Sequence, residues 1–230
     1  MITMEKIAAL LLAAHAFGDF ALQPGWLVAR KSRWPYLLLH AGIHALVAYI
    51  LLQDWAGWQA PLFVFAAHTV IDSCKSRMPD TAKWFAIDQL LHVLSLLLLA
   101  WSLVQFGILS QFSGAAYQPI VLLAGLVLTV RGSGFLIEKF ASRLIQQNRL
   151  EIDGLIDGGK WIGLFERALI FLLIFIDQPA GIGFLVAAKS ILRFEESRQQ
   201  KLAEYVLIGT LLSFSLAIAL SYLTKWALTL

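Results

Sequence analysis

Long apolar runs dominate this sequence and set the first limit on its fold. A membrane span needs about 20 mostly apolar residues. Eight stretches approach this length: 5–23, 34–53, 57–74, 84–107, 118–138, 160–177, 180–194 and 204–226. Of the 230 residues, 59% are hydrophobic and only 14% are charged, and the mean hydropathy is +0.74, which excludes an ordinary soluble domain. The sequence therefore predicts an all-α, polytopic transmembrane helix bundle of about eight spans.

Basic residues fall in alternate loops between these runs. They gather at 30–33, 75–83, 131–160 and 193–201, while the loops around Asp54, at 108–117 and around Asp177 contain no Lys or Arg. Short loops rich in Lys and Arg stay on the cytoplasmic side. We therefore expect a multi-pass protein of the inner (plasma) membrane with cytoplasmic basic loops and both termini outside. The net charge of +3 then reports orientation in the lipid bilayer, and nucleic acid is not an expected partner.

The first half of the sequence contains an internal repeat. AAHAFGD aligns with AAHTVID, and LLLHAGIHALVAYIL aligns with FAIDQLLHVLSLLLL. This indicates a parallel repeat of two helical hairpins, related by an axis along the membrane normal. The polar segment at 141–160 lies within the second half. We expect a four-helix metal-binding half at 1–110 and a four-helix half at 111–230 with cationic residues on the cytoplasmic side.

Each of the four runs in the first half carries a polar pair spaced i, i+4. The pairs are His15 and Asp19, His40 and His44, His68 and Asp72, and Asp88 and His92. On a helix this spacing places both side chains on one face, one turn apart. All four pairs lie in the cytoplasmic half of their spans, so they share one depth. Every histidine of the chain belongs to this set.

The free-energy cost of placing charged side chains in a membrane limits the roles that these pairs can have. One aspartate at the centre of a spanning helix costs about 2.5–3.5 kcal/mol, so three of them need compensation. Imidazole and carboxylate donors suit zinc, and also manganese or iron. Eight ligand side chains are more than one tetrahedral ion can bind and are enough for two ions. We therefore predict a divalent-metal centre with all eight residues as ligands. Hydrogen bonds between helices or a proton relay are the alternatives.

Two further expectations follow from a metal centre. Asp19, Asp72 and Asp88 are the candidate catalytic residues, one of which would act as general base. The single cysteine, Cys74, excludes a cysteine-rich metal site.

Charged residues also lie within the apolar runs of the second half. Glu166, Arg167, Lys189 and Arg193 are near the predicted cytoplasmic ends of their spans. They can be snorkelling cations and ion pairs between helices. The sharper hypothesis is a substrate-binding cradle that holds a phosphate or carboxylate.

Several segments resemble one bacterial multi-pass membrane family, known as domain of unknown function 3307. They are HAFGDFALQPGWL, LLLHAGIHAL, HTVIDSCKSR and DQLLHVLSL, within roughly residues 8–105, and GGKWIGLFERALIF and AAKSILRF resemble the long form of the family. The resemblance implies a membrane protein and no particular activity. The i, i+4 pairs alone are also similar to those of membrane-bound metal-dependent hydrolases, whose surrounding sequence this chain does not share.

Three functions are compatible with such a centre. The favoured hypothesis is a metal-dependent hydrolase that acts on a phosphate-bearing or lipid-linked substrate at the cytoplasmic leaflet. A divalent metal-ion transporter or sensor would use the same ligands reversibly, although transporter sites usually lie near the membrane midplane. A non-haem dinuclear iron redox protein is the third, and it would be expected to employ more histidines. The sequence does not indicate an oligomeric state.

Overall fold

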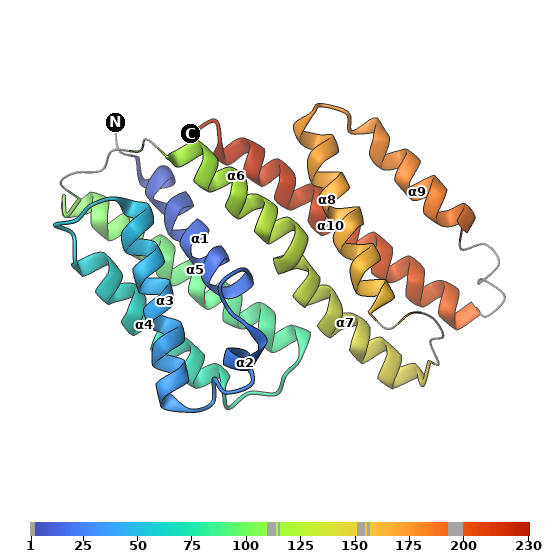
Figure 1. The fold of residues 1–230 in the computed structure, drawn as a ribbon, viewed down its shortest axis with the longest axis horizontal. Coiled ribbons are helices and arrows are strands. Elements are labelled where there is room, and N and C mark those ends of the chain that lie inside the picture. Colours follow the sequence, from blue (N-terminus) through green and yellow to red (C-terminus); the bar gives the residue numbers. More distant parts are fainter. Residues whose placement is uncertain (1–2, 110–113, 115, 151–154, 156, 193–199) are drawn as a thin grey trace. The chain divides into compact units, whose positions relative to one another are not determined.

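The computed structural model of the chain describes residues 3–109, 114, 116–150, 155, 157–192 and 200–230. All the regular structure in this part of the chain is helical, which confirms the predicted all-α class (Figure 1). The chain divides into two compact units. Met1–Val127 and Trp226–Leu230 form the N-terminal unit, and Leu128–Lys225 form the C-terminal unit.

Five long helices and one short helix build the N-terminal unit. They are α1 (Met4–Phe20), α2 (Gly25–Val28), α3 (Trp34–Leu52), α4 (Gln59–Lys75), α5 (Ala82–Gln105) and α6 (Tyr117–Val127). The side chains of Thr3 and Thr81 accept hydrogen bonds from the backbone N–H groups of Lys6 and Trp84, both at 3.4 Å. These threonines therefore cap α1 and α5 where the first N–H groups of a helix lack partners.

Four of these helices close a ring. Helix α1 packs against α3, α3 against α4, α4 against α5, and α5 against α1, while α6 packs on another side of α1. Most of α1 is buried, including Ala13, Ala14, Ala16 and Gly18. Small residues let helix backbones approach closely, so α1 can occupy the most enclosed position in the unit.

The outer surface of this ring is apolar, whereas polar side chains lie inside it. Large exposed apolar residues include Leu46 on α3, Val70 on α4 and Leu94 on α5. Trp34 begins α3 and Trp55 lies three residues beyond its end, and both are exposed. The 19 residues of α3 span about 28 Å at 1.5 Å per residue, close to the thickness of the bilayer core. An apolar exterior with tryptophans at both ends is typical of a membrane-embedded bundle.

The C-terminal unit begins with a change of helical register. A π-helical turn, η1 (Leu128–Gly132), leads into α7 (Ser133–Asn148), and α8 (Gly158–Phe175), α9 (Ala180–Leu192) and α10 (Gln200–Ala227) follow. Asp157, in the left-handed conformation with φ 58°, directly precedes α8. The sequence does not indicate the π turn, because Gly132 and Gly134 are equally typical of helix packing in membranes.

Four stretches of the described chain are long and apolar enough to cross a membrane. They are Trp34–Leu52, Ala82–Gln105, Tyr117–Asn148 and Gln200–Ala227. The other four predicted spans are also helical, as α1, α4, α8 and α9. As membrane spans they stay predictions, as do the hairpin repeat, the functional halves at 1–110 and 111–230, and the position of the termini.

Candidate metal centre

The four polar pairs face the inside of the helix ring. His15 and Asp19 lie on α1, His40 and His44 on α3, His68 and Asp72 on α4, and Asp88 and His92 on α5. Every one of these side chains is at most 10% exposed. Because each pair occupies one helix face, the closed ring brings all four faces together.

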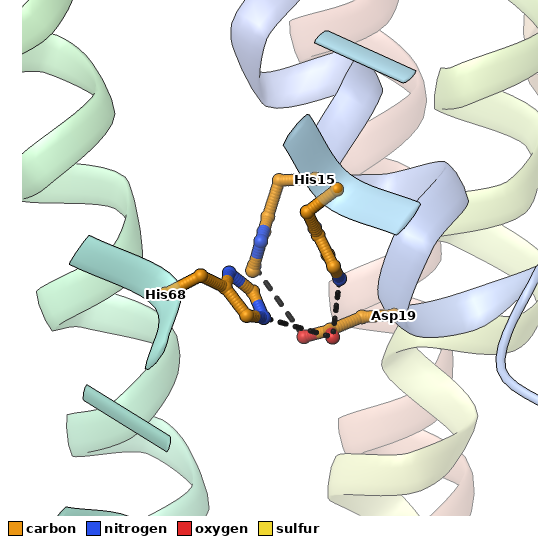
Figure 2. Close-up of side chains that lie close together, drawn as sticks. His15, Asp19 and His68 are labelled. Carbon is orange, nitrogen blue, oxygen red and sulfur yellow. Dashed lines mark ion pairs between the residues drawn. The ribbon is translucent and has the colours of Figure 1, made fainter. Parts of the chain in front are cut away.

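Asp19 is the meeting point of three helices. Its Oδ1 atom lies 3.2 Å from the Nε2 atoms of both His40 and His44, and 3.9 Å from Nε2 of His68. Its Oδ2 atom lies 3.5 Å from Nε2 of His15, one turn earlier on α1. Figure 2 shows the imidazoles of His15 and His68 directed at this carboxylate from α1 and α4.

Asp72 is a second meeting point. Its Oδ2 atom lies 3.4 Å from Nε2 of His40 and 3.5 Å from Nε2 of His68, and its Oδ1 atom lies 3.9 Å from Nε2 of His92. The two Nε2 atoms of His40 and His68 are themselves 3.1 Å apart. Asp19 and Asp72 therefore share two imidazoles, and their surroundings form one cluster.

His92 is held in an orientation suited to a ligand. Its Nδ1 lies 2.9 Å from the backbone carbonyl oxygen of Asp88, and a carbonyl can only accept, so this nitrogen must carry the proton. In the neutral ring, Nε2 then carries no proton and has a lone pair available for a metal ion. Metal-binding histidines commonly donate their second ring N–H to such a carbonyl.

Several buried nitrogen and oxygen atoms of the cluster lack a well-aligned hydrogen bond. They are Nδ1 of His15 and His40, Nε2 of His44 and His92, and one carboxylate oxygen each of Asp19, Asp72 and Asp88. Buried polar groups are hydrogen-bonded in the great majority of cases. Contacts such as that between Nε2 of His44 and Oδ1 of Asp19 are short enough for an ion pair but lack the alignment of a hydrogen bond. This is expected when several metal-ligand atoms point toward one common position.

The separations between these atoms fit metal coordination. Two donors bound to one tetrahedral ion at about 2.0–2.1 Å lie roughly 3.3–3.4 Å apart, and the contacts above range from 3.1 to 3.9 Å. Three overlapping groups can each offer ligand atoms within 4.8 Å of one another: His15, Asp19, His44 and His68; His40, His68 and Asp72; and Asp72, Asp88 and His92. The residues present therefore fit one or two divalent cations.

Gln89 joins the cluster, although the sequence does not single it out. Its Nε2 donates to Oδ2 of Asp19 at 2.9 Å and to Oδ2 of Asp88 at 3.4 Å. Its Oε1 lies 3.2 Å from Nε2 of His15, which must then donate and leaves Nδ1 of His15 as the available lone pair. Gln89 therefore orients two carboxylates and one imidazole, as outer partners of metal ligands do.

Two lysines also reach the cluster. Nζ of Lys31 lies 2.7 Å from Oδ2 of Asp72, and Nζ of Lys75 lies 3.0 Å from Oδ2 of Asp88. Asp19 makes no ion pair with a lysine or arginine within the described ranges. Charge compensation by lysine therefore reaches two of the three carboxylates of the cluster.

Gly18 has a role that depends on the neighbouring helix. A Cβ atom at this position would overlap three atoms of the His44 imidazole, so the absence of a side chain lets α3 bring this ring to Asp19. The change Gly18→Ala is expected to displace His44 and to lower metal affinity roughly 10- to 100-fold, the range for losing a partner that orients a ligand. Titration of the purified protein with zinc measures this effect.

Gly42→Ala is the matched control for this change. Gly42 lies on α3, between the two histidines of that helix, and an added Cβ would meet no atom within 4 Å. Alanine is favoured over glycine within a helix by about 1 kcal/mol, so this variant should keep its zinc affinity and unfold at an equal or higher temperature. Equal zinc affinity in the Gly18→Ala and wild-type proteins would contradict the assigned packing.

The charged residues predicted to bind substrate belong to the C-terminal unit, and three of the four lie among the described residues. Nζ of Lys189 donates to Oε2 of Glu166 at 2.8 Å. This contact is an ion pair between helices, one of the two roles expected for these residues from the sequence. Arg167 is buried, and its Nε donates to the carbonyl oxygen of Val130 in η1 at 3.0 Å. Arg193 lies outside the described residues.

Arg167 and Lys189 line separate cavities. Arg167 lines one of ≈ 430 Å³ together with Arg131 and Lys160. Lys189 lies in another, of ≈ 420 Å³, lined by residues of α9 and α10. The substrate-binding roles of these residues stay predictions.

Comparison with known proteins gives one match. Residues 7–117 match the model of a family described as "Protein of unknown function (DUF3307)". The matched range contains all four His and Asp pairs, together with Gln89, Lys31 and Lys75. Searches of curated proteins and of solved structures found no match.

Proposed function

We propose that the N-terminal unit binds one or two divalent metal ions and acts as a metal-dependent hydrolase on a phosphate-bearing or lipid-linked substrate at the cytoplasmic leaflet. The observation that carries the proposal is the convergence of four His and Asp pairs in one enclosed cluster, where several buried nitrogen and oxygen atoms lack a well-aligned hydrogen bond. Zinc suits these donors, and manganese or iron would also fit.

The distances suggest how two ions would be shared. One ligand group consists of Asp19, His44 and His68, and the other of Asp72, Asp88 and His92. His40 lies between the groups, 3.2 Å from Asp19 and 3.4 Å from Asp72. His15 belongs to the first group, and its Nε2 lies 3.5 Å from Oδ2 of Asp19 and 3.2 Å from Oε1 of Gln89.

The chemistry follows from this donor set. A divalent ion supplies a Lewis acid that activates water and stabilises negative charge on a phosphoryl or carbonyl oxygen. Asp19, Asp72 and Asp88 keep the catalytic role predicted for them, since a carboxylate that is not holding an ion can accept a proton from the attacking water. Ligands at most 10% exposed and tied to Gln89 and to the backbone favour retention of the ion over the release that a transporter needs.

Hydrolysis can be tested with the purified full chain. We expect the zinc- or manganese-loaded protein to release inorganic phosphate or fatty acid from a panel of phospholipids and soluble phosphate esters. Chelation or Asp72→Asn should reduce the rate at least about 100-fold, because removing one essential electrostatic group already costs roughly that much. A lipid profile of a deletion strain identifies which substrate accumulates.

The control variant and the competing functions give distinct results. Val70→Ala alters an exposed side chain two residues from Asp72 on α4 and should leave the rate unchanged. A metal-loaded protein that hydrolyses none of these substrates and carries zinc or manganese into liposomes would instead be a transporter. A protein that holds only iron and changes its absorption spectrum on reduction would be a redox protein.

A further inference from the structure

Two lysines enter the metal cluster from the end where the basic loops lie. Lys31 belongs to the turn between α2 and α3, and Lys75 is the last residue of α4. Their side chains are 25% and 22% exposed. Each ammonium group therefore contacts a buried carboxylate while part of its side chain still reaches solvent.

Packing directs both side chains inward. Leu27 of α2 is fully buried and fixes the segment that carries Lys31 against the unit. Nζ of Lys75 lies 5.5 Å from the centre of the Phe85 ring on α5, within the range of a cation–π contact. The two ammonium groups are therefore held at the cluster, unlike surface lysines that move freely in water.

Charge balance indicates what these lysines do once metal is bound. With neutral imidazoles, the three aspartates and two lysines leave the cluster with one net negative charge. One divalent ion reverses this to one net positive charge, and two ions raise it to three. Lys31 and an ion would then compete for the same oxygen of Asp72, 2.7 Å from Nζ. An anion placed between the ammonium group and the ion removes this conflict.

We propose that Lys31 and Lys75 bind the anionic group of the substrate, a phosphate, beside the metal ions. This inference rests on the proposed function and deepens it. Lysine is a common phosphate ligand because its ammonium group is a compact charge with three donors. A tetrahedral dianion has enough oxygens to contact both ammonium groups and an ion. The phosphate can belong to a lipid headgroup or to a soluble ester, and both present the same chemistry to these lysines.

The test measures phosphate binding and metal content on the same samples. Calorimetric titration of the zinc-loaded full chain with inorganic phosphate should show binding. The double change Lys31→Met and Lys75→Met should weaken binding at least about 10-fold, the effect of losing one charged hydrogen bond, while zinc content stays at the wild-type level. Lys31→Arg, which keeps the charge, should retain most of the affinity. Lys83→Met, at an exposed lysine over the Trp84 ring, is the control and should change nothing.

Three results of these measurements would contradict the role of the two lysines. Unchanged phosphate affinity in the double variant, or a zinc-loaded wild type that binds no phosphate, overturns the inference and leaves the proposed function intact. Loss of zinc from the double variant also overturns it, because the lysines would then serve the metal site. A wild type without metal removes both proposals. Competition by phosphatidic acid in mixed micelles, set against glycerol 3-phosphate, distinguishes a lipid source from a soluble one.

Discussion

The change Asp72→Ala is expected to abolish binding of divalent metal by the purified protein. Asp72 contacts imidazoles from three helices, through His40, His68 and His92, and lies in two of the three possible ligand groups. Losing an outer partner of a ligand already costs roughly 10- to 100-fold in metal affinity, so losing this carboxylate should cost more. Elemental analysis after chelator-free purification measures the result.

Two further variants separate loss of a ligand from loss of the fold. Asp72→Asn keeps the size of the side chain and removes its charge, and it should also lose the metal. Val70→Ala on the outer face of α4 should keep it. An Asp72→Ala protein with wild-type metal content would show that this carboxylate is paired only with Lys31, at 2.7 Å, and has no part in coordination.

Removing the metal should lower the thermal stability of the wild-type protein substantially. A ligand at about 1,000 times its dissociation constant stabilises the folded state by about 4 kcal/mol. For a chain of this size each kcal/mol corresponds to roughly 2–4 °C, so a chelator should lower the unfolding temperature by about 10 °C. The physical reason is that Asp19 has no lysine or arginine partner among the described residues, so a bound metal ion would add positive charge next to this carboxylate.

The same scan on Asp72→Asn provides the control. That variant should unfold at one temperature with or without chelator, because it has no metal to lose. Adding zinc back to the chelated wild type should restore its original unfolding temperature. A wild-type protein whose unfolding temperature responds to neither chelator nor zinc would contradict a metal that stabilises the ring of helices.

The cluster could be predicted from the sequence because its pattern is local. Each i, i+4 pair fixes a helix face without knowledge of any other helix, and the fact that all five histidines fall in such pairs indicates a shared centre. Which atoms meet is a different matter. That His40 contacts both Asp19 and Asp72 depends on the rotation of α3 within the ring, which no spacing along one helix reveals.

The missed residues have physical explanations of the same kind. Gln89 follows Asp88 on α5, and a neighbouring position on a helix points about 100° away, so its approach to Asp19 depends on tertiary packing. Lys31 lies in a turn, where sequence gives no direction for a long side chain. Gly18 is informative only once His44 is known to pack on it.

The fold shows the same division between local and tertiary information. The all-helical class follows from composition, and the first predicted run, 5–23, is close to α1, Met4–Phe20. The order of the helices in the ring is harder to predict from the sequence, because an amphipathic or apolar pattern does not indicate which helices become neighbours. The predicted run 118–138 is also shorter than the observed helical stretch, Tyr117–Asn148, because α7 continues beyond the apolar residues into the polar segment.

An alternative explanation of the cluster involves no metal. Lys31 and Lys75 neutralise two carboxylates, and hydrogen bonds from Gln89 support the third, so the network could serve only to hold four helices together. Against this, a structural network aligns hydrogen bonds between its buried groups, whereas Nε2 of His44 and Nε2 of His92 face carboxylate oxygens at 3.2 and 3.9 Å without that alignment. This poor alignment is the reason to favour coordination.

The metal content of the full-length wild-type protein, purified in detergent without chelator, tests the central claim most directly. Elemental analysis of a helical, monodisperse sample should find one to two equivalents of zinc, manganese or iron per chain. A sample of the same quality that contains none, and that takes up none when zinc is added, would contradict a metal centre built from the four His and Asp pairs.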